Sequence, residues 1–112
     1  MKYIALIILV LISFNLFANP PKKIILNFSG ADKTLVVKIE HFVTKPDKHY
    51  VSSVKVYLNG KEITKKDYTK QSSNESLDDY FSIENTNPGD IIKVVATCNQ
   101  SGTLSQIYTI PK

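Results

Sequence analysis

Several residue types are absent from this chain, and each absence argues against certain classes of function. There is no arginine and no tryptophan. Bidentate arginine contacts dominate phosphate and base recognition, so the sequence argues against a nucleic-acid reader. The lysines behind the net charge of +4 are scattered, as expected for a solvated surface. The chain also lacks a glycine-rich phosphate loop and a Cys-x-x-Cys zinc motif.

Sulfur is scarce as well. Cys98 is the single cysteine, so no internal disulfide can stabilise the domain. A lone thiol in an oxidising compartment must be buried, bound to a metal, modified or paired with another chain. Burial without reactivity is the ordinary outcome for such a residue. The only methionine is Met1, which removes the usual axial ligand of a blue-copper centre.

A long hydrophobic run occurs only at the N-terminus. Lys2 precedes an unbroken apolar stretch over residues 4–12, and Ala18 stands at a plausible cleavage point before Asn19. We therefore predict a signal peptide over residues 1–18 and one mature domain, residues 19–112, exported to the periplasm or secreted. An uncleaved anchor is disfavoured because the run is short for a hydrocarbon core of ~30 Å. No membrane contact is expected after cleavage.

The rest of the chain is patterned as strands. Val54, Val56 and Leu58 alternate with polar or aromatic residues, and Asn59-Gly60 predicts a tight hairpin. Residues 69–75 have no periodicity and are predicted to form a loop. The predicted strands are residues 23–28, 35–40, 50–58, 62–68, 79–84, 91–98 and 103–110. About seven short strands at this spacing predict an all-β antiparallel sandwich. Its predicted core includes Val36, Ile39, Val54, Val56, Val94 and Ala96.

Three side chains carry candidate metal chemistry. His41 and His49 flank a loop that contains Pro46, and Cys98 ends a predicted buried strand. Imidazole and thiolate are favoured ligands of transition metals, and this set suits iron, zinc or copper. The three groups would meet if the sandwich brings these strand ends together. In the alternative interpretation the histidines flank an exposed loop, Cys98 is an inert core residue, and no cofactor binds.

The same loop carries two lysines. Lys45 and Lys48 could attract an anion, because a positive rim raises the local anion concentration. Lys48 is the one weak candidate for a catalytic role. The ordinary interpretation is that both are solvated loop lysines.

The order of these groups resembles that of the superoxide reductases, including neelaredoxin and the C-terminal domain of desulfoferrodoxin. The resemblance rests on His41, the Pro46 loop, His49 with its aromatic and aliphatic followers, and the segment from Cys98 to Gly102. It implies an immunoglobulin-like sandwich that holds one ferrous iron through four histidines and a cysteine thiolate. In that family the iron donates an electron to superoxide. His41, His49 and Cys98 would be the matching metal ligands.

The chain also departs from that pattern. Ser101 stands where the family has a histidine, Phe42 follows His41 where the family has proline, and the family's first histidine has no counterpart. The same sandwich occurs without iron in the Z subunit of the sulfur-oxidation carrier complex. Two functions therefore stay open: a superoxide reductase-type iron domain served by a small redox partner, and a non-enzymatic module that binds another secreted protein.

Overall fold

The computed structural model describes residues 19–112, and those residues form an all-β structure. The predicted signal peptide, residues 1–18, lies outside the described residues. Seven strands follow one another along the chain: β1 (Lys23–Ser29), β2 (Thr34–Glu40), β3 (Val51–Leu58), β4 (Lys61–Asp67), β5 (Ser76–Ser82), β6 (Ile91–Cys98) and β7 (Thr103–Thr109). The predicted fold class is confirmed. Within the described residues no helix is long and apolar enough to cross a bilayer.

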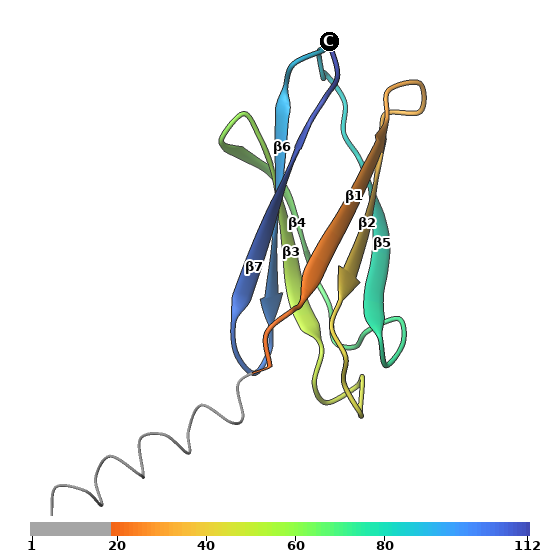
Figure 1. Ribbon diagram of the computed structural model, residues 1–112, viewed down its shortest axis with the longest axis vertical. Coiled ribbons are helices and arrows are strands. Elements are labelled where there is room, and N and C mark those ends of the chain that lie inside the picture. Colours follow the sequence, from red (N-terminus) through yellow and green to blue (C-terminus); the bar gives the residue numbers. More distant parts are fainter. Residues whose placement is uncertain (1–18) are drawn as a thin grey trace, which may run out of the picture.

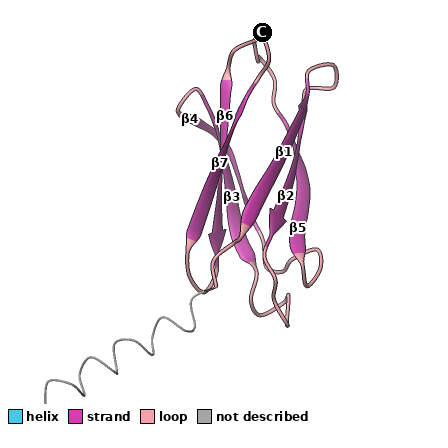
Figure 2. Cartoon of the chain, viewed as in Figure 1, coloured by secondary structure: helices cyan, strands magenta, loops and turns pink. Residues whose placement is uncertain are grey.

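The strands form two antiparallel sheets that face each other. One sheet has the order β1-β2-β5, and the other has the order β4-β3-β6-β7 (Figure 1). The chain changes sheet between β2 and β3, between β4 and β5, and between β5 and β6. This three-plus-four arrangement is an immunoglobulin-like sandwich. Figure 2 shows the two layers joined by loops at both ends.

The core lies between the inner faces of the two sheets. Alternate residues of β2, of β6 and of β3 from Val54 onward point inward, as the strand period of two requires. Five of the six predicted core positions are fully buried: Ile39, Val54, Val56, Val94 and Ala96. Val36 is a wrong prediction, because its side chain is 50% exposed. The inward phase of β2 belongs to Leu35, Val37 and Ile39, so Val36 faces solvent.

The turns follow the local sequence signals closely. Asn59 and Gly60 have φ values of 50° and 86°, so the tight hairpin between β3 and β4 is confirmed. The predicted loop over residues 69–75 is also correct. However, β5 begins at Ser76, earlier than the predicted residue 79. Ser76 and Leu77 are buried and pair with the end of β2, and this long-range pairing extends the strand.

The three candidate ligands share one end of the sandwich. His41 directly follows β2, His49 lies two residues before β3, and Cys98 ends β6. Val51 pairs with Cys98 across β3 and β6, so the start of one strand lies beside the end of the other. Figure 1 shows the loop between β2 and β3, the end of β6 and the start of β1 at the same lower end of the molecule.

Candidate metal centre

The structure brings His41, His49 and Cys98 together. One ligand atom from each lies within 4.8 Å of the others. Cys98 continues the inward phase of β6 and is 5% exposed, so its sulfur faces the end of the core. His49 Nε2 lies 3.2 Å from Cys98 Sγ. The two imidazole rings meet edge to face, with centroids 4.8 Å apart and an interplanar angle of 87°.

These separations fit one metal ion after a small adjustment. With bonds of about 2.0–2.1 Å to nitrogen and about 2.3 Å to sulfur, two donors at a right angle lie about 3.1 Å apart. The 3.2 Å between His49 Nε2 and Cys98 Sγ matches that value. A nitrogen and a sulfur donor on opposite sides of one ion lie about 4.4 Å apart. Ligand atoms separated by as much as 4.8 Å would therefore have to approach each other by roughly 0.4 Å. Two imidazoles and a thiolate are a donor set that iron, zinc and copper accept.

Gln71 fixes the orientation of His41. The His41 side chain is fully buried, and its Nδ1 lies 2.5 Å from Gln71 Oε1. Gln71 Nε2 donates to the backbone carbonyls of His41, at 3.0 Å, and Ser73, at 3.2 Å. Gln71 Oε1 also accepts from Val51 N at 3.0 Å. The amide oxygen therefore faces His41, and Nδ1 must carry the hydrogen that it donates.

This tautomer leaves the other ring nitrogen of His41 for a ligand. When Nδ1 carries the hydrogen of a neutral imidazole, Nε2 holds the free lone pair that a metal would take. In the structure, His41 Nε2 lies 2.8 Å from the backbone carbonyl oxygen of Asn19. A hydrogen bond from Nδ1 to an amide oxygen is a usual support for a metal-binding histidine.

Asn99 holds the His49 segment against the Cys98 strand. Its side-chain oxygen accepts from Tyr50 N at 2.9 Å, and its Nδ2 donates to the Lys48 carbonyl at 3.0 Å. Its backbone N–H donates to the Tyr50 carbonyl at 3.0 Å. The sulfur of Cys98 accepts a backbone N–H from Gln100 at 3.4 Å. These contacts fix the spacing between the His49 imidazole and the Cys98 sulfur.

His49 is suited to be a neutral ligand. Burial lowers the pKa of His49, the neighbouring His41 lowers it further, and a hydrogen bond to the Asn19 backbone acts in the opposite direction. The lowered pKa favours the unprotonated imidazole at neutral pH, which is the form that binds a metal. A pocket of about 280 Å³ opens beside this histidine and is lined by Asn19, Phe42, Val43, Thr44 and His49.

The catalytic candidate Lys48 takes no visible part in this centre. Lys45 and Lys48 are exposed, and within residues 19–112 their ammonium groups make no hydrogen bond or ion pair. The backbone of Lys48 does contribute, because its carbonyl accepts from Asn99. The role of Lys48 stays a prediction.

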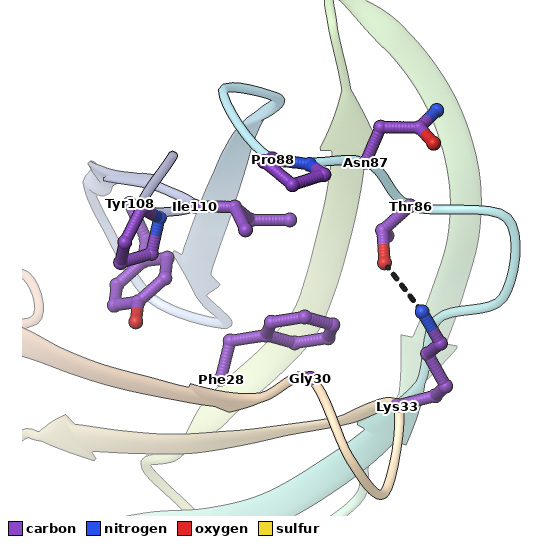
Figure 3. Close-up of a pocket in the computed structure, with 9 residues that line it drawn as sticks. Phe28, Gly30, Lys33, Thr86, Asn87, Pro88, Tyr108 and Ile110 are labelled. Carbon is purple, nitrogen blue, oxygen red and sulfur yellow. Dashed lines mark hydrogen bonds between the residues drawn. The ribbon is translucent and has the colours of Figure 1, made fainter.

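Another pocket lies at the opposite end of the sandwich. Figure 3 shows Phe28, Tyr108, Ile110 and Pro88 around it, with Lys33 donating to Thr86 Oγ1 at 3.4 Å. Its volume is about 400 Å³. The lining is mostly apolar and holds neither histidine nor the cysteine. The candidate chemistry of the chain therefore lies at the His41 end.

Gln71, Asn99 and Asn19 are functional candidates that sequence reasoning missed. Gln71 lies in an aperiodic loop, and its side-chain partners outside that loop come from two other segments, at His41 and at Val51. Asn99 belongs to the Cys98–Gly102 segment that carries the resemblance, but the sequence reasoning gave it no role of its own. Nothing in the local sequence marks Asn19 as a neighbour of His41.

Comparisons with known proteins agree on the fold alone. No protein-family model matches the chain, and no curated protein is significantly similar to it in sequence. Among solved structures, a variant form of superoxide reductase (neelaredoxin) from Ignicoccus hospitalis superimposes with a TM-score of 0.51 at 13% identity, covering 84% of this chain and 82% of that one. A second variant form gives 0.51 at 14% identity, with coverages of 89% and 84%. The chain therefore has a fold similar to that of superoxide reductase, and at one end of this fold lies a cluster of two histidines and a cysteine.

Proposed function

We propose that this chain is an exported redox domain of the superoxide reductase type that binds one iron ion through His41, His49 and Cys98. The observation that carries the proposal is the convergence of the three donor atoms within 4.8 Å. The fold similarity and the order of ligands along the sequence support it. Zinc and copper suit the same donors, but copper would lack the axial methionine of a blue-copper site.

Each residue has a defined part in this proposal. His49 and Cys98 present a neutral nitrogen and a sulfur 3.2 Å apart. His41 presents Nε2, because Gln71 holds the hydrogen on Nδ1. Bound iron would supply one-electron chemistry, with superoxide as the substrate that the resemblance implies. Lys48 would attract such an anion to the pocket beside His49.

The second candidate is a non-enzymatic module that binds another secreted protein. One observation favours it: both ring nitrogens of His41 already contact carbonyl oxygens, those of Gln71 and Asn19. A buried histidine with two partners can serve a purely structural role. In that case His49 and Cys98 form a simple imidazole–thiol contact and no ion is needed.

Anaerobic reconstitution separates the two candidates. Mature protein is incubated with ferrous iron, desalted, and measured for bound metal and for thiolate-to-iron charge-transfer absorption after oxidation. The proposal expects one iron per chain and a colour that Cys98→Ser abolishes, because the sulfur donor is gone. Lys70→Ala changes an exposed loop residue and serves as the control. This variant should keep both the bound iron and the charge-transfer absorption. If the chain binds no iron, zinc or copper, the non-enzymatic binding module is the candidate function that remains. Unchanged absorption in Cys98→Ser would overturn the role of the sulfur.

A further inference from the structure

Asn19, the first described residue, contacts the candidate metal centre. The backbone carbonyl oxygen of Asn19 lies 2.8 Å from His41 Nε2. The backbone nitrogen of Asn19 lies 3.3 Å from Ser101 Oγ, and its side-chain Nδ2 donates to the Phe42 carbonyl at 3.1 Å. Asn19 thus contacts two segments that converge at this end of the sandwich, residues 41–42 and the turn at Ser101.

The fold holds this N-terminal segment in a fixed place. Gly102 has a φ of +87°, and a Cβ at that position would come within 2.2 Å of Pro20 Cβ. Only glycine allows the turn after Cys98 to approach Pro20 so closely. Pro21 is buried, and Lys22 N donates to the Glu40 carbonyl at 2.8 Å. Asn19 is therefore positioned by packing and by backbone pairing on its C-terminal side.

The contact between Asn19 and His41 itself points to a cation. Because Nδ1 of His41 donates to Gln71, a neutral His41 ring would hold its lone pair on Nε2. That lone pair faces a carbonyl oxygen at 2.8 Å, and two electron-pair donors at this distance need a proton or a metal ion between them. Two ligands at a right angle on one ion, with bonds of about 2.0–2.1 Å, are about 2.9 Å apart.

The predicted signal cleavage would change the chemistry of Asn19. Cleavage between Ala18 and Asn19 converts the backbone nitrogen of Asn19 from an amide into an α-amine. An amide nitrogen delocalises its lone pair into the adjacent carbonyl and is a poor metal donor, whereas an α-amine has a localised lone pair once a metal ion displaces its proton. The amine nitrogen and the carbonyl oxygen of one residue can close a five-membered ring on a single ion.

We propose that the mature N-terminus completes the centre: the α-amine and carbonyl oxygen of Asn19 chelate the metal ion together with His41, His49 and Cys98. This inference rests on the metal-binding function proposed above. It supplies two donors beyond the three side chains, and the amine loses a proton when the ion binds. The uncleaved precursor lacks the amine donor, so removal of the signal peptide completes the ligand set.

The residues after Asn19 exclude the common form of terminal metal binding. An ordinary chain terminus can bind copper through deprotonated backbone amides of its second and third residues. Here those residues are Pro20 and Pro21, which have no N–H. An ion bound by the Asn19 amine therefore cannot take the backbone amides of the second and third residues as ligands.

The test uses anaerobic cobalt(II) binding by two mature proteins that differ only at the terminus. One begins at Asn19, and the other keeps Ala18, which moves the amine by one residue and leaves every side chain unchanged. Chelator competition measures affinity, visible d–d bands report the ligand number, and the ultraviolet thiolate-to-cobalt band reports Cys98. Circular dichroism and thermal unfolding confirm that both proteins fold.

We expect the thiolate band in both proteins, with affinity at least about tenfold lower and altered d–d bands when Ala18 is retained. Equal affinity and equal d–d bands would overturn the role of Asn19 while leaving the side-chain site intact. Absence of a thiolate band in both would instead defeat the proposed metal function, and this inference with it. Mass spectrometry gives the first residue of the exported protein. A first residue other than Asn19 would also overturn the proposed role of the Asn19 amine.

Discussion

Gln71 contacts His41 at both its ring and its backbone. The side-chain oxygen of Gln71 accepts the Nδ1 hydrogen, and the side-chain nitrogen donates to the His41 carbonyl at 3.0 Å. A single buried amide thus sets the tautomer of the ring and its position at the end of β2. The availability of His41 Nε2 for a metal depends on this residue, which is 5% exposed and lies in a loop.

Gln71→Ala should weaken both the centre and the fold. It leaves His41 Nδ1, Val51 N and the His41 carbonyl without their partner, which we expect to cost about 1–3 kcal/mol of unfolding free energy. Metal affinity should fall by roughly 10–100-fold, as for other supporting partners of histidine ligands. Urea unfolding and chelator competition measure the two effects. Lys70→Ala in the same loop is the control, because Lys70 is exposed, and equal losses in both variants would contradict the assigned role.

Gly102→Ala should be more damaging than Gly60→Ala. Both glycines have positive φ, at +87° and +86°, so both variants carry the backbone penalty of about 1 kcal/mol. Only at Gly102 does the added Cβ meet Pro20, because Gly60 faces open space. Gly102→Ala should therefore show the larger drop in unfolding free energy and a loss of metal affinity. Equal unfolding free energies for the two variants would show that Pro20 does not pack there.

Asp79 should make stability depend on acidity. Burial by itself would raise the pKa of Asp79, but hydrogen bonds from Tyr68 Oη, at 2.6 Å, from Tyr80 N and from Lys66 Nζ, at 3.1 Å, together hold it below its usual value. A carboxyl with a depressed folded pKa stabilises the fold above its unfolded pKa of about 4. That contribution is lost as the pH falls through the folded pKa.

Asp79→Asn should therefore have a lower free energy of unfolding than wild type at pH 7. The difference between the two proteins should shrink as the pH falls below about 4, because the wild-type carboxyl then becomes protonated. Urea unfolding between pH 2 and pH 7 measures this dependence. The control is Asp67→Asn, because the Lys65–Asp67 pair is mostly exposed and should contribute little. A constant difference between wild type and Asp79→Asn across this range would contradict the prediction.

Leu35→Ala and Val36→Ala test the phase of β2. Leu35 is fully buried, so its truncation should cost about 2–5 kcal/mol. Val36 is 50% exposed, and its truncation should cost under about 1 kcal/mol. Urea unfolding at neutral pH compares the two. Similar losses would place Val36 in the core, as the sequence had suggested.

Most of the fold was predictable because its signals are local. Alternation identifies β3, and Asn59-Gly60 marks the following hairpin through two residues that accept positive φ. The phase of β2 was not predictable, because Val36 and Val37 are both apolar and only packing decides which one points inward. The early start of β5 was missed for a related reason, since Leu77 is a lone apolar residue whose partner Ile39 is far away in sequence.

The candidate centre was predictable only in its side chains. His41, His49 and Cys98 carry recognisable chemistry at strand ends, so their convergence could be anticipated from a sandwich. Gln71 and Asn19 act on the same centre through contacts with segments distant in sequence. Such contacts leave no local pattern. Binding of the ion itself stays a prediction.

X-ray absorption of the iron-loaded mature protein tests the central claim most directly. If His41, His49 and Cys98 bind the ion, the spectrum should contain one sulfur at roughly 2.3 Å together with nitrogen or oxygen neighbours at roughly 2.0–2.2 Å. Cys98→Ser should lose the sulfur shell while the lighter neighbours remain. A wild-type spectrum with only nitrogen and oxygen neighbours would contradict the account, because the ion would then lie away from Cys98.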